Sequence, residues 1–288
     1  MSASLRPDVA RLTISCPDRP GIVAAVTGFL AEEGANVIHA DQHSTDPEGG
    51  RFFMRVEFHL AELAHHDPEL RAGFAAIAAR FGMSWQLTAE SEVPSVALLA
   101  SRNDHCLLDL LWRWRSRELP MNLAFVASNH DRLRSDVEGF GVPFHHVPQE
   151  EQPAGEQQLV ALLAQHEVNL VVLARYMRIL SAELLDRAGC PMINIHHSFL
   201  PAFPGADPYR AAHDRGVKLI GATAHYVTAE LDQGPIIAQD TTAVGHRDTV
   251  ADLKRIGADL ERLVLARAVR LHLERRVLVD GNRTVVFA

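Results

Sequence analysis

The stretch NIHHSFLPAFPG, residues 194–205, places side chains suited to acyl chemistry where a strand is expected to end. Asn194 and His196 are two positions apart, so on a β-strand both side chains point to one face. The apolar run before them and the prolines after them indicate the end of a buried strand. Open α/β sheets place their sites at such strand ends. An Asn amide can stabilise an oxyanion, and a histidine can exchange a proton near neutral pH.

A carboxylate and a further histidine lie in a second stretch, GATAHYVTAELDQGPII, residues 221–237. His225 falls on an expected strand, and Asp232 falls in the loop that follows it. If this strand lies near the first one, the Asn, His and Asp side chains converge. Asp232 would then orient His196 or act as general base toward a water molecule, with His225 in a supporting position. The set predicts attack on a carbonyl carbon without a serine or cysteine nucleophile.

Each of these residues also has a purely structural explanation. Asn194 would end a strand by bonding nearby backbone, His196 or His225 would be a core histidine with a satisfied hydrogen bond, and Asp232 would cap the turn before Gly234. The set His196, His225 and Asp232 also matches the ligand types of zinc. The chain has no HExxH or comparable short ligand spacing. We therefore expect neither a metal nor a cofactor.

The composition limits the class of protein. A chain of 288 residues is long enough for two domains, and its net charge of -8 disfavours nucleic acid and anionic membranes as partners. Cys16, Cys106 and Cys190 are scattered and form no CxxC pair, which favours a reducing compartment. The amino-terminal segment lacks the apolar core of a secretory signal, and no apolar run is long enough to span a bilayer. We expect a cytoplasmic protein that binds neither nucleic acid nor membrane.

Residues 1–92 predict a ferredoxin-like domain with the order βαββαβ. The expected strands are residues 9–16, 35–44, 51–60 and 84–90. The expected helices run from Pro20 to Gly34 and from Pro68 to Phe81. A short linker, EVPS, follows at residues 92–95.

Residues 96–288 predict a second, Rossmann-like α/β domain with a mostly parallel sheet. Apolar strands alternate with helices, which implies parallel strands covered on both faces. The expected strands are residues 95–101, 122–128, 141–147, 169–175 and 192–197, with helices over 106–116, 156–166 and 181–188. Two antiparallel strands are expected at 219–227 and 235–244. A long helix over 248–274 is expected to dock through Leu253, Ile256, Leu260 and Leu263, before a hairpin at 277–287.

The two stretches that carry Asn194, His196 and Asp232 resemble the N-formyltransferase family that uses 10-formyltetrahydrofolate. By this resemblance the three residues form the catalytic set. The segment RYMRILS, residues 175–181, is similar to the folate-pocket segment of the family. The match implies that the pterin site is lined by Met177, Arg178, Ile179 and Leu180. Without the match, the same segment reads equally well as a helix start with two core residues.

Longer matches point to the branch of that family that hydrolyses formyltetrahydrofolate. The stretch from Cys16 to Phe58 resembles an ACT domain, and HCLLDLLWRW and GVPFHHVP resemble the catalytic domain of this branch. The His196-His197 pair fits as well, since transferases of the family usually carry proline after the catalytic histidine. The loop SRNDH lacks the glycines that would cradle a phosphate of a nucleotide acceptor, and the acidic chain lacks a basic RNA-binding extension. Water is left as acceptor, with formate and tetrahydrofolate as products. The resemblance implies a supply of formate for purine biosynthesis and balance of the one-carbon folate pool.

The ACT resemblance implies an amino-acid effector such as glycine or methionine, held by Asp18, Gly21 and Asn36. A helix start can hold a carboxylate, and a glycine there allows close approach. The alternative is that this domain only joins subunits in a homo-oligomer, a dimer or tetramer. Two other functions also stay open: a catalytically inactive folate-sensing protein, and formyl transfer to a small amine.

Overall fold

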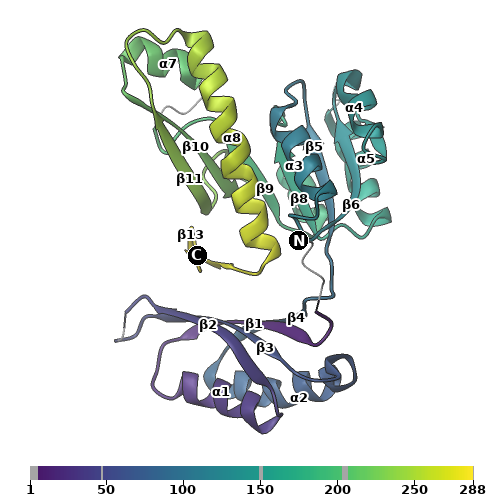
Figure 1. Cartoon of the computed structure of the whole chain (residues 1–288), viewed down its shortest axis with the longest axis vertical. Coiled ribbons are helices and arrows are strands. Elements are labelled where there is room, and N and C mark those ends of the chain that lie inside the picture. Colours follow the sequence, from purple (N-terminus) through teal and green to yellow (C-terminus); the bar gives the residue numbers. More distant parts are fainter. Residues whose placement is uncertain (1–5, 47, 149–151, 203–206, 288) are drawn as a thin grey trace.

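The computed structural model describes residues 6–46, 48–148, 152–202 and 207–287, and folds them around two main sheets (Figure 1). One sheet belongs to the amino-terminal part of the chain and the other to the remainder, and each has its own apolar core. A two-stranded hairpin near the carboxyl end lies between the two parts.

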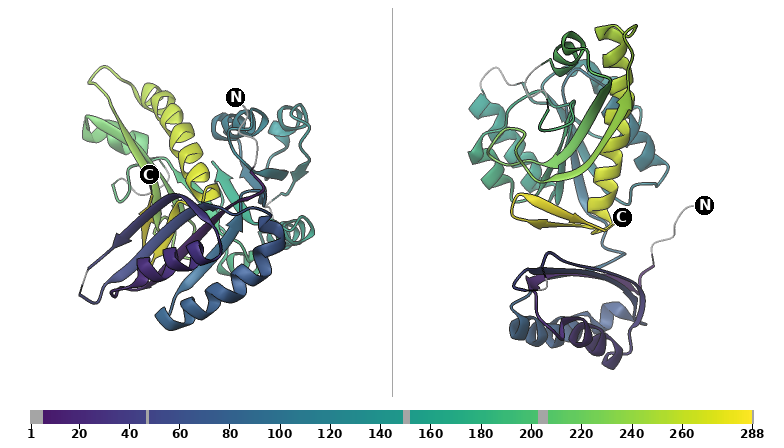
Figure 2. Two further views of the ribbon diagram at one scale, coloured as in Figure 1. Left: turned by 60° about the horizontal axis from the view of Figure 1, so that its bottom comes forward. Right: turned by 90° about the vertical axis from the view of Figure 1, so that its left-hand side faces the viewer.

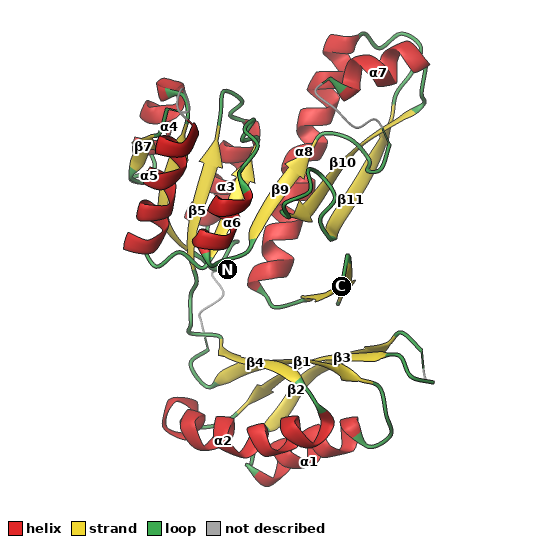
Figure 3. Ribbon diagram, turned by 180° about the vertical axis from the view of Figure 1, so that it is seen from behind, coloured by secondary structure: helices red, strands yellow, loops and turns green. Residues whose placement is uncertain are grey.

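The first sheet is ferredoxin-like, as predicted. The elements are β1 (Val9–Pro17), α1 (Ile22–Glu32), β2 (Asn36–Ser44), β3 (Arg51–His59), α2 (Leu63–Phe81) and β4 (Ser84–Ala89). The strands pair in the antiparallel order β2-β3-β1-β4, and both helices cover one face (Figure 3). The second helix begins at Leu63 instead of Pro68, because the buried Leu63 side chain anchors an additional turn ahead of the proline.

The second sheet has seven strands in the order β11-β10-β9-β8-β5-β6-β7. Its elements are β5 (Ser95–Ala100), α3 (His105–Arg115), β6 (Asn122–Ser128), η1 (Asp131–Leu133), α4 (Arg134–Glu138), β7 (Phe144–His146), α5 (Gln152–Gln165), β8 (Leu170–Ala174), α6 (Ala182–Ala188), β9 (Met192–His196), α7 (Pro208–Arg215), β10 (Leu219–Tyr226), β11 (Ile236–Ala243), α8 (Val250–Leu273), β12 (Val277–Asp280) and β13 (Arg283–Val286). The strands from β9 to β7 in this order are parallel, and β10 and β11 add the antiparallel pair that the sequence predicts. The mostly parallel α/β fold is confirmed.

The long helix α8 packs across β9, β10 and β11 and beside α3. A capping box between Thr249 and Asp252 begins it by satisfying free backbone N–H groups. The prediction that Leu263 docks was wrong, since its side chain is 53% exposed. The buried stripe runs instead through Leu253, Leu260 and Val264, and it includes the charged residue Glu261.

The two parts of the chain touch through the carboxyl end of α8 and the hairpin β12–β13, which lie over the strand face that α1 and α2 leave uncovered (Figure 2). The Arg55 guanidinium on β3 donates to the carbonyl oxygen of Glu274 at 3.2 and 3.3 Å. Arg51 pairs with Asp280 of the hairpin at 3.0 Å. Within the described residues, no helix is both long enough and apolar enough to cross a membrane.

Candidate active site

Strand pairing brings Asn194 and His225 together, as the sequence predicts for neighbouring strands. Asn194 lies directly opposite His225 in the antiparallel ladder between β9 and β10. Opposed residues share a face of the sheet, and His196 shares that face because it follows Asn194 by two positions. The ladder between β10 and β11 shifts at Ala224 and His225, an irregularity that often re-aims a side chain next to an active site.

The loop after β10 returns Asp232 to the same place. The backbone of Asp232 has a φ of 56°, a left-handed conformation that aspartate tolerates better than most residues. Gly234 lies so close to the end of β10 that a Cβ atom there would be 1.8 Å from the carbonyl oxygen of Tyr226. Only glycine permits this approach, so the Gly234 position holds the loop, and with it Asp232, against the strand.

The Asp232 carboxylate lies between two imidazoles. Its Oδ2 atom is 3.2 Å from Nδ1 of His196, and its Oδ1 atom is 3.6 Å from Nε2 of His225. The hydrogen bond with His196 and the longer contact with His225 hold the pKa of Asp232 well below its ordinary value, although burial alone would raise it. Asp232 is therefore an ionised acceptor, and Nδ1 of His196 carries the hydrogen between them.

One further contact fixes the role of Nδ1 of His225. Nδ1 of His225 lies 2.9 Å from the carbonyl oxygen of Tyr226, which can only accept, so this nitrogen carries a hydrogen. The Asn194 amide nitrogen lies 3.3 Å from Nε2 of His225. Nε2 of His196 is buried and has no hydrogen-bond partner among the described residues. A polar atom of a bound molecule would satisfy it, because buried polar atoms are nearly always paired.

The segment matched to the folate pocket lines a cavity of about 280 Å³ that also reaches these catalytic candidates. Met177 and Ile179 are exposed to 53% and 65%, whereas Leu180 is buried in the core beneath them. Arg178 lines the same cavity. The segment is a loop rather than the start of a helix. The opposite wall comes from the loop before Asp232, where Leu231 is exposed, and local sequence patterns did not single out that residue.

A second buried carboxylate, Glu261 on α8, lies behind this cavity and was missed from the sequence. It accepts from Tyr209 Oη at 2.6 Å and from His105 Nε2 at 2.8 Å, and Arg175 Nε lies 3.4 Å away. Burial alone would raise its pKa, but the His105 hydrogen bond, the Arg175 charge and the Tyr209 hydrogen bond together lower it. One signal for this cluster was available in the sequence, because Glu261 is a charged residue within the apolar stripe of α8.

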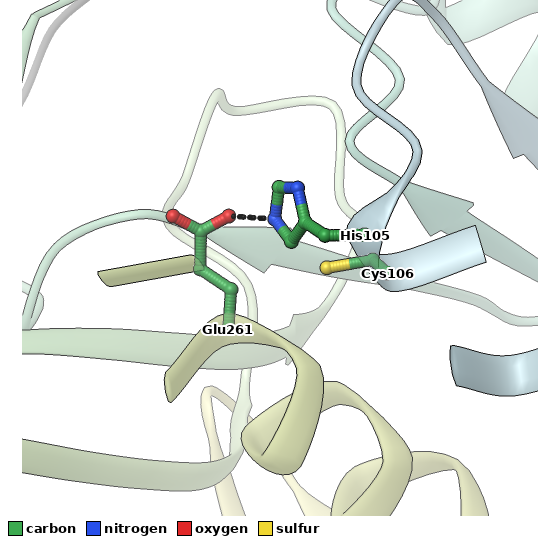
Figure 4. Close-up of side chains that lie close together, drawn as sticks. All are labelled: His105, Cys106 and Glu261. Carbon is green, nitrogen blue, oxygen red and sulfur yellow. Dashed lines mark hydrogen bonds and ion pairs between the residues drawn. The ribbon is translucent and has the colours of Figure 1, made fainter. Parts of the chain in front are cut away.

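His105, Cys106 and Glu261 have the donor types of a metal site and lie close together (Figure 4). The Arg175 guanidinium already pairs with the Glu261 carboxylate, so its positive charge takes the place that a metal cation would have beside that carboxylate. Burial raises the pKa of the Cys106 thiol, which disfavours the thiolate that binds metals. The donor set therefore fits an internal charge cluster better than an ion.

The three residues predicted to hold an effector do not form one site within a single chain. Asp18 follows β1 and accepts a hydrogen bond from Ser44, and Gly21 precedes α1 with a φ of 92°. Asn36 pairs with His59 at one end of β3, whereas Pro17, next to Asp18, pairs with Arg51 at the other end. The length of β3 separates them.

Comparison with known proteins defines the class that this fold and site belong to. The family described as formyl transferase matches residues 95–269, and the ACT domain family matches residues 10–72. The class is thus a formyl transferase domain that follows an ACT domain.

More specific relatives narrow this class. The formyltetrahydrofolate deformylase of Bacillus subtilis (strain 168) is 51% identical over 97% of this chain and 94% of its own length. The crystal structure of a formyltetrahydrofolate deformylase from Pseudomonas syringae pv. tomato superposes with a TM-score of 0.93 at 49% identity, over 97% of this chain and 94% of that one. The chain belongs to the formyltetrahydrofolate deformylase family. A glycinamide ribonucleotide transformylase from Symbiobacterium toebii is a more remote neighbour, with a TM-score of 0.63 and 33% identity over 68% of this chain and 95% of that one.

Proposed function

We propose that this protein hydrolyses 10-formyltetrahydrofolate to formate and tetrahydrofolate, and that it supplies formate for purine biosynthesis while balancing the one-carbon folate pool. The observation that carries the proposal is the convergence of Asn194, His196 and ionised Asp232 at the end of a cavity lined by residues 177–180. The relatives named formyltetrahydrofolate deformylase support the same reaction.

In the proposed mechanism the pterin lies against Met177, Arg178, Ile179 and Leu180, and the formyl group lies between Asn194 and His196. Asp232 orients a water molecule and draws its proton as the water oxygen attacks the formyl carbon. The Asn194 amide and protonated His196 stabilise the oxyanion of the tetrahedral intermediate. The bond from carbon to N10 then breaks, N10 takes a proton, and formate leaves. His225 holds Asp232 in place from the other side.

Formate release tests the reaction directly. Purified protein is incubated with 10-formyltetrahydrofolate without an added amine, with and without a metal chelator. We expect formate at the same rate in both samples, because we propose that protein side chains act without a metal or cofactor. Loss of formate in the chelator sample would contradict the metal-free mechanism. Tight folate binding without formate would favour a sensing protein or an amine transferase.

We further propose that the amino-terminal domain binds an amino acid such as glycine or methionine near Asp18 and Gly21. The ACT family match supports an effector, and the open space beside Gly21 supports close approach of a ligand. Asn36 would contribute only from another subunit, given its distance along β3. Calorimetry with glycine and methionine tests this proposal. The absence of a heat of binding with every amino acid would favour a domain that only joins subunits.

We also propose a cytoplasmic homo-oligomer, a dimer or tetramer. The edge strand β2 is exposed along most of its length, with Val37 and Ile38 among its exposed residues. An exposed edge strand whose outer side is not paired favours pairing with another copy. Light scattering during size-exclusion chromatography would measure the mass, and a monomer would contradict the proposal.

A further inference from the structure

His197 forms a shared wall between two cavities. On one side is the cavity of about 280 Å³ that contains the catalytic residues. On the other side is a mostly apolar cavity of about 420 Å³, with Phe199, Ala212 and Ile220 in its lining. His197 is buried and lines both. Phe199 and Leu219 are exposed at the second cavity, which gives solvent molecules access to it.

Tyr209 supports His197 from the far side. Its ring centroid is 5.8 Å from that of His197, which is in turn 5.2 Å from that of His196. Tyr209 is buried, and its hydroxyl donates to Glu261 at 2.6 Å. The ring fits beneath α8 only because residue 257 is glycine, where a Cβ atom would lie 1.9 Å from the Tyr209 oxygen.

Glu261 makes this support rigid. Its two carboxylate oxygens are engaged by Tyr209, His105 and Arg175, and the residue is 1% exposed. Displacing Tyr209 would leave a buried charge with one donor fewer, which is costly. The wall formed by His197 and Tyr209 is thus held by charged hydrogen bonds and not by apolar packing alone.

We propose that the wall formed by His197 and Tyr209 determines which nucleophile reaches the formyl group: it admits water and excludes organic amines that enter the apolar cavity. The proposal rests on the hydrolysis proposed above. If the wall opens, an amine nitrogen attacks the formyl carbon, and the bond from carbon to N10 breaks with its electron pair on N10. The proton lost by the amine passes to N10, so that an N-formyl amine and tetrahydrofolate form and no oxidant or cofactor is required.

Aniline is a suitable probe, because it is uncharged at neutral pH and its ring suits an apolar cavity. Native protein, Tyr209→Ala and Tyr209→Phe are incubated with 10-formyltetrahydrofolate and aniline, and formate and formanilide are measured. We expect Tyr209→Ala to raise the ratio of formanilide to formate by about tenfold or more, the scale of pocket-based discrimination. Tyr209→Phe is the matched comparison, which keeps the ring but removes the hydroxyl that donates to Glu261, so we expect a rise in the ratio well below that of Tyr209→Ala.

His197→Ala opens the same wall from the catalytic side, and it serves as a second variant if Tyr209→Ala does not fold in a thermal melt. If the folded variants still release formate and the ratio of formanilide to formate is unchanged, the proposed role of the wall is contradicted and the proposed hydrolysis is not. Ready formation of formanilide by the native protein would overturn the wall as well. Absence of formate from native protein without aniline would overturn the proposed function, and the inference that rests on it.

Discussion

Asp232 and Glu261 are two carboxylates with similar partners and different surroundings. Both accept from histidine, and both have a pKa held below the ordinary value. Asp232 keeps 18% of its side chain exposed at a cavity, whereas the Glu261 side chain is 2% exposed and is also engaged by Tyr209 and Arg175. The comparison teaches that donor type does not define an active site. Access for a ligand distinguishes the first cluster, because buried polar atoms without a hydrogen-bond partner among the described residues occur in both, at Nε2 of His196 in the first and at Nε and Nη1 of Arg175 in the second.

The largest effect is expected for Asp232→Asn. The amide cannot accept the proton of the attacking water, so kcat should fall by about a thousandfold, within the range of general acid–base effects. The melting temperature at neutral pH should fall as well, because the ionised carboxylate stabilises the folded state, so activity is compared per folded molecule. Rates of formate release and thermal melts check both points. Asp240→Asn, which alters a surface carboxylate paired with Arg267, is the control with native activity.

For Glu261→Gln the same comparison predicts a large loss of stability and only a small loss of activity. The change leaves Arg175 buried without its countercharge, so the free energy of unfolding should fall by about 3 kcal/mol. The rate of hydrolysis per folded molecule should fall by less than about tenfold, because Glu261 contacts no reacting atom. Urea unfolding measures the first quantity.

The buried Glu156 provides the control for that measurement. Its carboxylate is held by Ser181 and Gln152, which are neutral donors. Glu156→Gln should therefore cost less stability than Glu261→Gln. Equal losses in the two variants would show that the Arg175 charge is unimportant.

A smaller effect on turnover is expected for Asn194→Ala. Loss of one oxyanion donor should lower kcat by about a hundredfold, while the Michaelis constant changes less, since the donor acts mainly on the transition state. Steady-state kinetics separate the two constants. A rise in the Michaelis constant alone would assign Asn194 to substrate binding instead.

The smallest expected effect is a change in acid sensitivity. Both carboxylates have lower pKa values in the folded than in the unfolded protein, so the unfolded state binds more protons in acid. Their stabilisation is complete above the unfolded pKa of about 4 and is lost as the pH falls, at up to about 1.4 kcal/mol per pH unit for each group. Melts across this range should show a shallower decline in Asp232→Asn and Glu261→Gln. An unchanged slope in both would contradict the assigned pKa directions.

Local patterns predicted much of the fold and the residues of the first cluster. The strand ends of β9 and β10 were visible in the sequence, and the spacing of Asn194 and His196 predicted their common face, which the pairing with His225 fits. Folding around Asp232 depends on Gly234, whose approach to Tyr226 is a tertiary contact. The catalytic roles themselves remain predictions.

The second cluster was not predictable from local patterns. Glu261 meets Tyr209 across 52 positions and His105 across 156, and periodicity carries no information on such pairs. Asn36 shows the same limit, since strand register places it at the far end of β3 from Asp18. The prediction that α2 begins at Pro68 was wrong for a different reason. Burial of Leu63 outweighed the preference of proline for a first helical turn.

The sharing of Glu261 among Tyr209, His105 and Arg175 has an evolutionary consequence. A single substitution in this group leaves a buried charge or donor unpaired, and residues of one network are energetically coupled. A lineage that changes the acceptor by remodelling this region must therefore pass through a destabilised intermediate or change several positions together. The free-energy costs of substitutions within this network should therefore not add, and a combined change of several members should cost less than the sum of the single changes.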